Sequence, residues 1–455
     1  VGLNTLGSNT TADNNVAVGK NALVLNTTGD SNVALGSSAL SSNTTARANI
    51  GIGNSALGNN TTGANNVAIG HVADNTTAGG NTAVGYLALN ANTTAGGNVA
   101  VGSGALGSNT TGSNNTASGH SALTANTTSD NNTAFGQGAL QANTTASHNT
   151  AVGWNSLGAN TTGTANVAVG RSALLYNTTG DELTAVGNNA LQSNTTADGS
   201  TAVGRYALLN CTTGRHNTAI GKSAMQEGTT ALDNTAVGWE AMKHVTTAQG
   251  NVALGNRCSI ALTTAINTIS IGNGANAFVT TGGNNIGIGG NANGGVTTAV
   301  SNTAIGSSSG SDTNGSGSYN TCVGQSAGYD LNAGANNTLL GYEAGRPGSP
   351  SGEVDSESGV VCLGNNSVTD FYCDESLTAT SDGRDKADVE NFTIGLDFVK
   401  QMRPVTYRWD RRSWYVEDNF DEHNVNQITK EDIVSAVPDG SKKKDKINLG
   451  FIAQE

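Results

Sequence analysis

The residues most capable of chemistry in this chain are its cysteines, its Asn-Thr-Thr triplets and a few aromatic side chains. No CxxC spacing and no nearby histidine pair marks a metal or redox motif among Cys211, Cys258, Cys322, Cys362 and Cys373. We expect small buried residues there, with a disulfide or an interchain link as the alternative. No carboxylate pair, Ser/His/Asp set or metal-ligand cluster recurs before residue 345, so we predict neither catalysis nor a cofactor in that section.

Twelve Asn-Thr-Thr triplets, from Asn9 to Asn194, match the acceptor pattern for N-glycosylation. The repeat sets this motif, so we interpret it as a turn asparagine followed by stacked threonines. Regular threonine rows also suggest an ice-binding face. Such a face needs flat outward rows, however, and here the triplet lies beside an arc of variable length.

Aromatic and cationic side chains recur directly after a repeated glycine, and their mixed polarity indicates a solvent-facing position. Trp154 and Trp239 could stack on the sugars of a host surface. We favour an incidental placement, and the ligand-binding residues stay unknown. The residues concerned are Lys20, Tyr86, Trp154, Arg171, Trp239 and Tyr342.

Charge is scarce over most of the 455 residues. Of 21 Lys+Arg and 34 Asp+Glu, the stretch from Ser381 onward holds 12 and 15, which leaves the long preceding section sparsely charged and mildly acidic. This excludes nucleic-acid binding by a basic surface. No apolar stretch approaches the roughly 20 residues of a membrane span, and we recognise no signal peptide. Glycine contributes 62 residues and proline 4, which suits a thin stacked structure better than disorder.

One glycine series sets the architecture. It runs from Gly2 through Gly36 to Gly70, resumes at Gly85 and continues every 17 residues to Gly306, with three unequal steps in all. A unit of 17 residues cannot bury its own apolar positions, but stacked coils can place each valine over the next about 4.8 Å away. We therefore predict a parallel β-solenoid with one coil per 17 residues over 1–345.

The residues before each glycine alternate as in a strand. In one copy, Val33 and Leu35 enclose Ala34, and Asn32 begins the strand. We expect the bulky face to be buried and the alanine face to be so crowded that only a methyl group fits, as at an interchain contact. An Ala-Leu pair three and four residues after the glycine predicts a second buried segment. Asparagine ladders favour such in-register stacking.

The copies "NVAVGKNAL", "NVALGSSAL" and "NTAVGWNSL" resemble the head repeats of YadA-type trimeric adhesins. That resemblance covers residues 1 to about 345. It implies a left-handed parallel β-roll and a homotrimer, although the unit in that family is usually shorter than 17 residues. Later copies such as "CVGQSAG" resemble a variant common in phage tail-fibre proteins.

Composition changes near Arg346. We interpret 346–380 as a linker with a last irregular coil and 381–455 as the start of a small α+β domain that caps the solenoid. Ile394, Phe398 and Met402 have helical spacing, and Pro404 ends that pattern. Val405–Trp409 alternates as a strand does, and 448–455 is a further apolar segment.

The segments "SDGRDKADVENFTIGLDFVKQMRPVTYRWD" and "GFIAQE" resemble the endosialidase-type intramolecular chaperone of phage tail spikes and fibres. In that family the domain assists trimerisation and then cuts the chain before the serine of Ser-Asp-x-Arg-x-Lys. The resemblance implies that Thr380–Ser381 is the scissile bond, Ser381 the nucleophile and Lys386 the base. The family's domain usually continues past the equivalent of Glu455, so we expect a truncated copy here.

These observations favour a homotrimeric fibre or spike of a virion that binds a host cell-surface receptor, which could be a polysaccharide. One alternative is a bacterial trimeric surface adhesin or extracellular filament, and another is a self-processing Ser/Lys peptidase. A membrane anchor or a virion-attachment domain in flanking sequence would separate the first two. An ice-binding solenoid ranks last.

Overall fold

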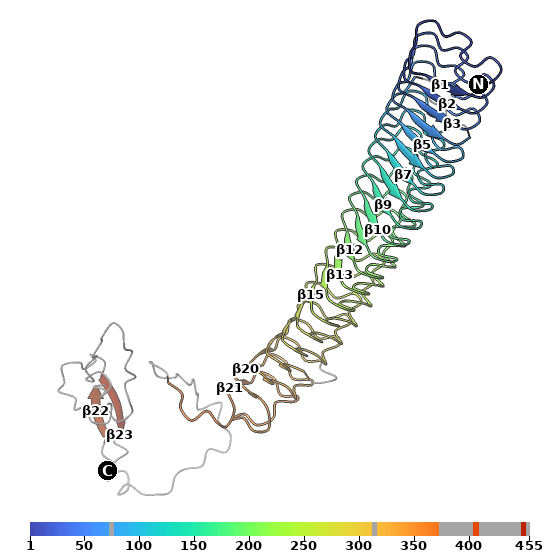
Figure 1. Cartoon of the computed structure of the whole chain (residues 1–455). Coiled ribbons are helices and arrows are strands. Elements are labelled where there is room, and N and C mark those ends of the chain that lie inside the picture. The colour runs from blue at the N-terminus through green and yellow to red at the C-terminus, as the bar shows by residue number, and fades with distance from the viewer. Residues whose placement is uncertain (72–76, 312–315, 373–403, 409–446, 452–455) are drawn as a thin grey trace, which may run out of the picture. The chain divides into compact units, whose positions relative to one another are not determined.

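The computed structural model describes residues 1–71, 77–311, 316–372, 404–408 and 447–451. It confirms an all-β parallel β-solenoid, in which 21 strands of three residues form one sheet along the stack of coils (Figure 1). No helix occurs among the residues described. The strands are β1 (Val16–Val18), β2 (Val33–Leu35), β3 (Ile50–Ile52), β4 (Val67–Ile69), β5 (Thr82–Val84), β6 (Val99–Val101), β7 (Thr116–Ser118), β8 (Thr133–Phe135), β9 (Thr150–Val152), β10 (Val167–Val169), β11 (Thr184–Val186), β12 (Thr201–Val203), β13 (Thr218–Ile220), β14 (Thr235–Val237), β15 (Val252–Leu254), β16 (Ile269–Ile271), β17 (Ile286–Ile288), β18 (Thr303–Ile305), β19 (Thr321–Val323), β20 (Thr338–Leu340) and β21 (Val361–Leu363).

Each strand pairs in parallel with the next one, equivalent residue over equivalent residue, so that Val16 lies beside Val33 and Ala17 beside Ala34. The register survives the unequal steps of the repeat. Across the 15-residue step Val67 still pairs with Thr82. The change of length is therefore taken up outside the strands. We predicted a surface arc for the two missing residues, and that position falls at 72–76, outside the described residues.

The interior of each coil holds small strand residues, not bulky ones. Ala34 and Ala68 are fully buried, as is Leu40 of the Ala-Leu segment, which confirms that second buried segment. A Cβ added at Gly51 would lie 3.3 Å from Leu40 Cγ and 2.9 Å from the Ala56 carbonyl oxygen, so the space admits little more than a methyl group. Our expectation that the bulky strand face is buried within the coil was wrong, because that face points outward. The crowded contact of the alanine lies inside its own chain.

Two asparagine ladders run through the coils. The Asn115 backbone N–H donates to Asn98 Oδ1 at 2.9 Å, and Asn98 Nδ2 donates to the Gly112 carbonyl at 2.9 Å. In the second ladder Asn126 Nδ2 donates to Asn109 Oδ1 at 2.8 Å. All of these side chains are buried. Because a buried amide without a partner destabilises a fold, the ladders fix which coil residues lie over one another.

The repeated glycine turns the chain at the end of each strand. Gly153 has φ of +132°, where side chains are disfavoured, and a Cβ there would lie 2.6 Å from the Gly170 carbonyl oxygen. Gly153→Ala should therefore destabilise the solenoid by about 3 kcal/mol. Thermal unfolding followed by circular dichroism measures this. Gly290→Ala is the control, since nothing lies closer than 3.9 Å to its added Cβ. Equal melting temperatures for the two variants would contradict the prediction.

The chain divides into two compact units, Val1–Phe371 and Tyr372–Glu455. In the second unit β22 (Pro404–Arg408) pairs antiparallel with β23 (Ile447–Phe451), at the two segments predicted to be extended or apolar. The helix predicted around Phe398 lies outside the described residues.

Candidate interaction surface

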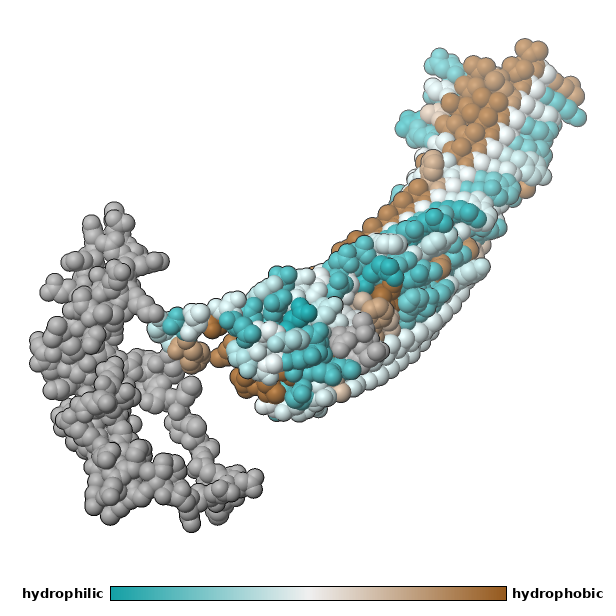
Figure 2. All heavy atoms as spheres, turned by 90° about the horizontal axis from the view of Figure 1, so that it is seen from below, coloured by the Kyte–Doolittle hydropathy of each residue, from teal (hydrophilic) through white to brown (hydrophobic). Residues whose placement is uncertain are grey.

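The outward residues of β1–β21 form a continuous surface along the solenoid, which we call the strand face. It comprises the first and third residue of every strand, and none of these residues is buried in the single chain. Figure 2 shows hydrophobic residues gathered in a band that follows the length of the solenoid. The most exposed of them on the strand face include Val16 at 50%, Phe135 at 59% and Val361 at 70%.

The strand face contains no charged residue. Its positions hold only Val, Ile, Leu, Thr, Phe and a single serine, Ser118. A contiguous exposed apolar patch of this extent marks an interaction site on a protein surface. With two residues on each of 21 strands, the face exceeds the roughly 20 to 30 residues that one partner contributes to a standard interface. The sequence repeat located these residues, but we assigned them to the wrong side of the coil.

One border of the strand face is formed by the residues two and three positions before each strand, which we call the entry edge. Seven carboxylates stand there: Asp13, Asp30, Asp130, Asp181, Glu182, Asp198 and Asp233. Several cap the neighbouring coil, since the Asp13 backbone N–H donates to Asp30 Oδ1 at 2.9 Å and that of Asp181 donates to Asp198 Oδ1 at 2.9 Å. The edge therefore combines local hydrogen bonding with exposed negative charge.

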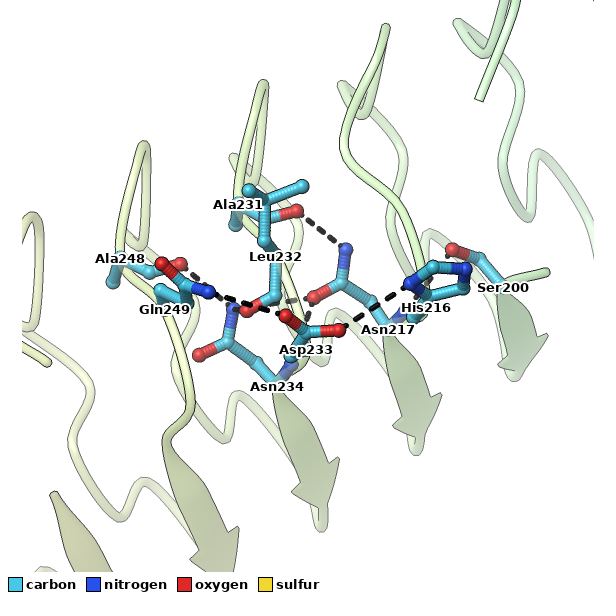
Figure 3. A network of polar contacts seen from close by, with 9 residues as sticks. All are labelled: Ser200, His216, Asn217, Ala231, Leu232, Asp233, Asn234, Ala248 and Gln249. Carbon is cyan, nitrogen blue, oxygen red and sulfur yellow. Dashed lines mark hydrogen bonds and ion pairs between the residues drawn. The ribbon is translucent and has the colours of Figure 1, made fainter. Parts of the chain in front are cut away.

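Figure 3 shows one stretch of this edge. His216 Nδ1 lies 3.3 Å from Asp233 Oδ1, and Gln249 Nε2 donates to Asp233 Oδ2 at 3.2 Å, so three successive coils are linked. Beneath them Asn217 Nδ2 donates to the Ala231 carbonyl at 2.6 Å, as the buried ladder requires. His216 and Asp233 are at least half exposed, so their contact adds little stability.

The opposite border is formed by the residue two positions after each strand, the exit edge. It contains no Asp or Glu at any coil. The Arg171 guanidinium lies over the Trp154 ring, 5.1 Å from its centroid. Trp154 and Trp239 are each 44% exposed, as their mixed-polarity column predicted. The larger side chains of this edge are Lys20, His71, Tyr86, His120, Trp154, Arg171, Arg205, Lys222, Trp239 and Tyr342.

The Asn-Thr-Thr triplets serve the fold. Asn109 is buried and its Nδ2 donates to the Gly112 carbonyl at 2.8 Å, so the folded solenoid offers no accessible amide to a glycosyl transferase there. The first threonine of a triplet donates its hydroxyl to the next coil, as Thr110 does to the Thr127 carbonyl at 2.9 Å. Only the second threonine is exposed, for example Thr111, which leaves a single row. The structural interpretation of the triplets is confirmed.

The cysteines of the solenoid are small buried residues. Cys211, Cys258, Cys322 and Cys362 are free and buried, which confirms that interpretation, whereas Cys373 lies outside the described residues. Burial raises the pKa of the Cys211 thiol to about 11 and that of the Cys322 thiol to about 12. These thiols are therefore protonated and unreactive near neutral pH.

Within the described ranges, no group of three metal-ligating side chains occurs and no helix is long and apolar enough to cross a membrane. Thr380, Ser381 and Lys386 lie outside those ranges.

Comparison with known families bears on the C-terminal segment alone. Residues 381–455 match the family model described as chaperone of endosialidase. No curated protein matches the chain. The chain thus joins a β-solenoid to a C-terminal segment similar to the endosialidase chaperone.

Proposed function

We propose that this chain forms the shaft of a homotrimeric fibre that binds a host or cell surface, and that its C-terminal domain acts as the chaperone for trimerisation. The observation that carries the proposal is the match of 381–455 to the endosialidase chaperone directly after a solenoid with an uncharged apolar face. An elongated fold with an apolar face along its whole length is suited to a fibre, because lateral association removes that face from water. The location of such a fibre is a virion or a cell surface.

The proposal includes self-cleavage. After assembly, the Ser381 hydroxyl attacks the Thr380 carbonyl carbon, Lys386 takes the hydroxyl proton, and the amine of Ser381 leaves as the new N-terminus after hydrolysis of the ester. The family match at 381–455 begins at Ser381, which supports this position for the cut.

Sedimentation of the full chain tests the assembly. One chain has a mass of 45.6 kDa, and the particle is expected to have three times the mass of the chain it contains, cut or uncut. A monomer at micromolar concentration would contradict the proposal. Binding to immobilised bacterial surface polysaccharides and to intact bacterial cells tests the receptor, and an absence of retention on both would remove host binding from the proposed function.

A further inference from the structure

We propose that the strand face is the contact between copies of this chain, and that the exit edge of each copy lies against the entry edge of its neighbour in a parallel ring. This inference rests on the proposed trimer and adds to it which surfaces meet and in which direction.

The first argument is apolar area. The strand face is uncharged from β1 to β21 and its residues stay partly exposed in the single chain, so an equally long partner is needed to cover it. A second copy of the chain has the required length and the same spacing between coils. Stacked coils repeat about every 4.8 Å, so two copies can match along their whole length without losing register.

The second argument is charge. The exit edge carries Lys20, Arg171, Arg205 and Lys222 without any carboxylate, whereas the entry edge carries seven carboxylates and two cations with fixed charge, Arg47 and Arg215. Rotation about the long axis brings the exit edge of one copy beside the entry edge of the next. An antiparallel pair would instead bring like edges together. Complementary charge favours the parallel arrangement.

The third argument is level along the solenoid. Lys20 and Asp13 flank the same strand, β1, and Arg205 and Asp198 both flank β12. Two further cations follow strands whose next coil begins with a carboxylate: Arg171 follows β10 and precedes Asp181, and Lys222 follows β13 and precedes Asp233. One coil is about 4.8 Å, a step that these long side chains can span. Arg215 stands at the level of Lys222, with carboxylates on the coils above and below it.

Site-directed cross-linking tests the arrangement in the full chain, with Cys373→Ser in every variant and the buried native thiols left in place. Asp198→Cys and Arg205→Cys are combined and treated with a short bis-maleimide. The two positions are seven residues apart along a mostly extended segment, roughly 20 Å, which is too far for a bridge within one chain. We expect covalent trimers on a denaturing gel, because each chain is linked to two neighbours. A second pair, Asp13→Cys with Lys20→Cys, should give the same product if the first pair disturbs folding.

The controls separate the arrangements. Either cysteine alone should give no covalent product, whereas an antiparallel pair would give dimers from one cysteine and would overturn the inference. Asp198→Cys with Asn210→Cys, an exposed position six residues after the glycine of the same coil, should also give none. If sedimentation shows a trimer but neither edge pair is linked, the seam is wrong although the proposed fibre stands. If the chain is a monomer, both fail.

Discussion

Replacement of Ser381 by alanine should leave the chain uncut between Thr380 and Ser381, and Lys386→Ala should do the same. A serine hydroxyl is a weak nucleophile until a base accepts its proton. An ammonium group with the ordinary lysine pKa of about 10.4 is protonated at neutral pH and cannot serve. Burial of Lys386 on assembly would lower that pKa and make cleavage depend on correct assembly. Loss of either group should slow cleavage by at least about a hundredfold.

Gel electrophoresis of the chain, expressed with any coding sequence that follows Glu455, measures the cut. Ser376→Ala and Lys400→Ala are matched controls outside the motif and should be cut normally. Both site variants should still form trimers, which separates the chaperone role from the peptidase role. A wild-type chain that stays whole, or normal cleavage of Lys386→Ala, would show that the segment acts only as a cap.

Aspartate on the strand face should break the assembly without unfolding the coil. Val18→Asp, Phe135→Asp and Ile220→Asp introduce three charges at positions that are 46%, 59% and 40% exposed in the single chain. In the trimer each charge would be buried without a partner, which costs about 3 kcal/mol or more. The trimer should therefore dissociate at concentrations at least about a hundredfold higher than for the wild type.

The matched control carries Leu25→Asp, Tyr176→Asp and Phe278→Asp. These residues are 49%, 52% and 56% exposed, but they lie six residues after the glycine, away from the strand face. Sedimentation equilibrium compares the two triple variants, and circular dichroism checks that both keep their β-structure. A similar loss of trimer in the control variant, or none in the strand-face variant, would contradict an interface at this surface.

The repeat predicted the stacking well because a period-17 pattern has one physical solution. An apolar-small-apolar triplet followed by glycine defines a short strand and its corner, and the strand-start asparagine reports that coils lie in register. These features act locally and recur in every copy, so the pairing of Val16 with Val33 follows from the sequence alone.

The orientation of the strand could not be predicted in the same way. A period of two separates two faces but does not say which is inside. That depends on the width of the coil, which is set by the Ala-Leu segment opposite. In this segment Leu40 has φ of +51°, a conformation that leucine rarely adopts, and nothing in its side chain announces it. Its backbone N–H donates to the Ala56 carbonyl at 2.9 Å, so contacts with the next coil fix the turn.

The edges were missed for a related reason. Lys20 and Asp13 were visible as isolated charges in a sparsely charged sequence, but they acquire a common meaning only when the strand between them is known to face outward. The pair Ser381 and Lys386 came from resemblance, since no repeat or spacing in the chain singles out either residue.

Preservation of register across steps of unequal length has a consequence for how such a fibre can vary. Loss or gain of one whole coil keeps every asparagine over an asparagine and every strand-face residue over its equivalent. Length can therefore change in increments of about 4.8 Å at little energetic cost, whereas a partial coil is tolerated only between strands. Recombination between neighbouring repeats would supply fibres of graded reach from one gene, each with the same lateral contacts and the same C-terminal domain.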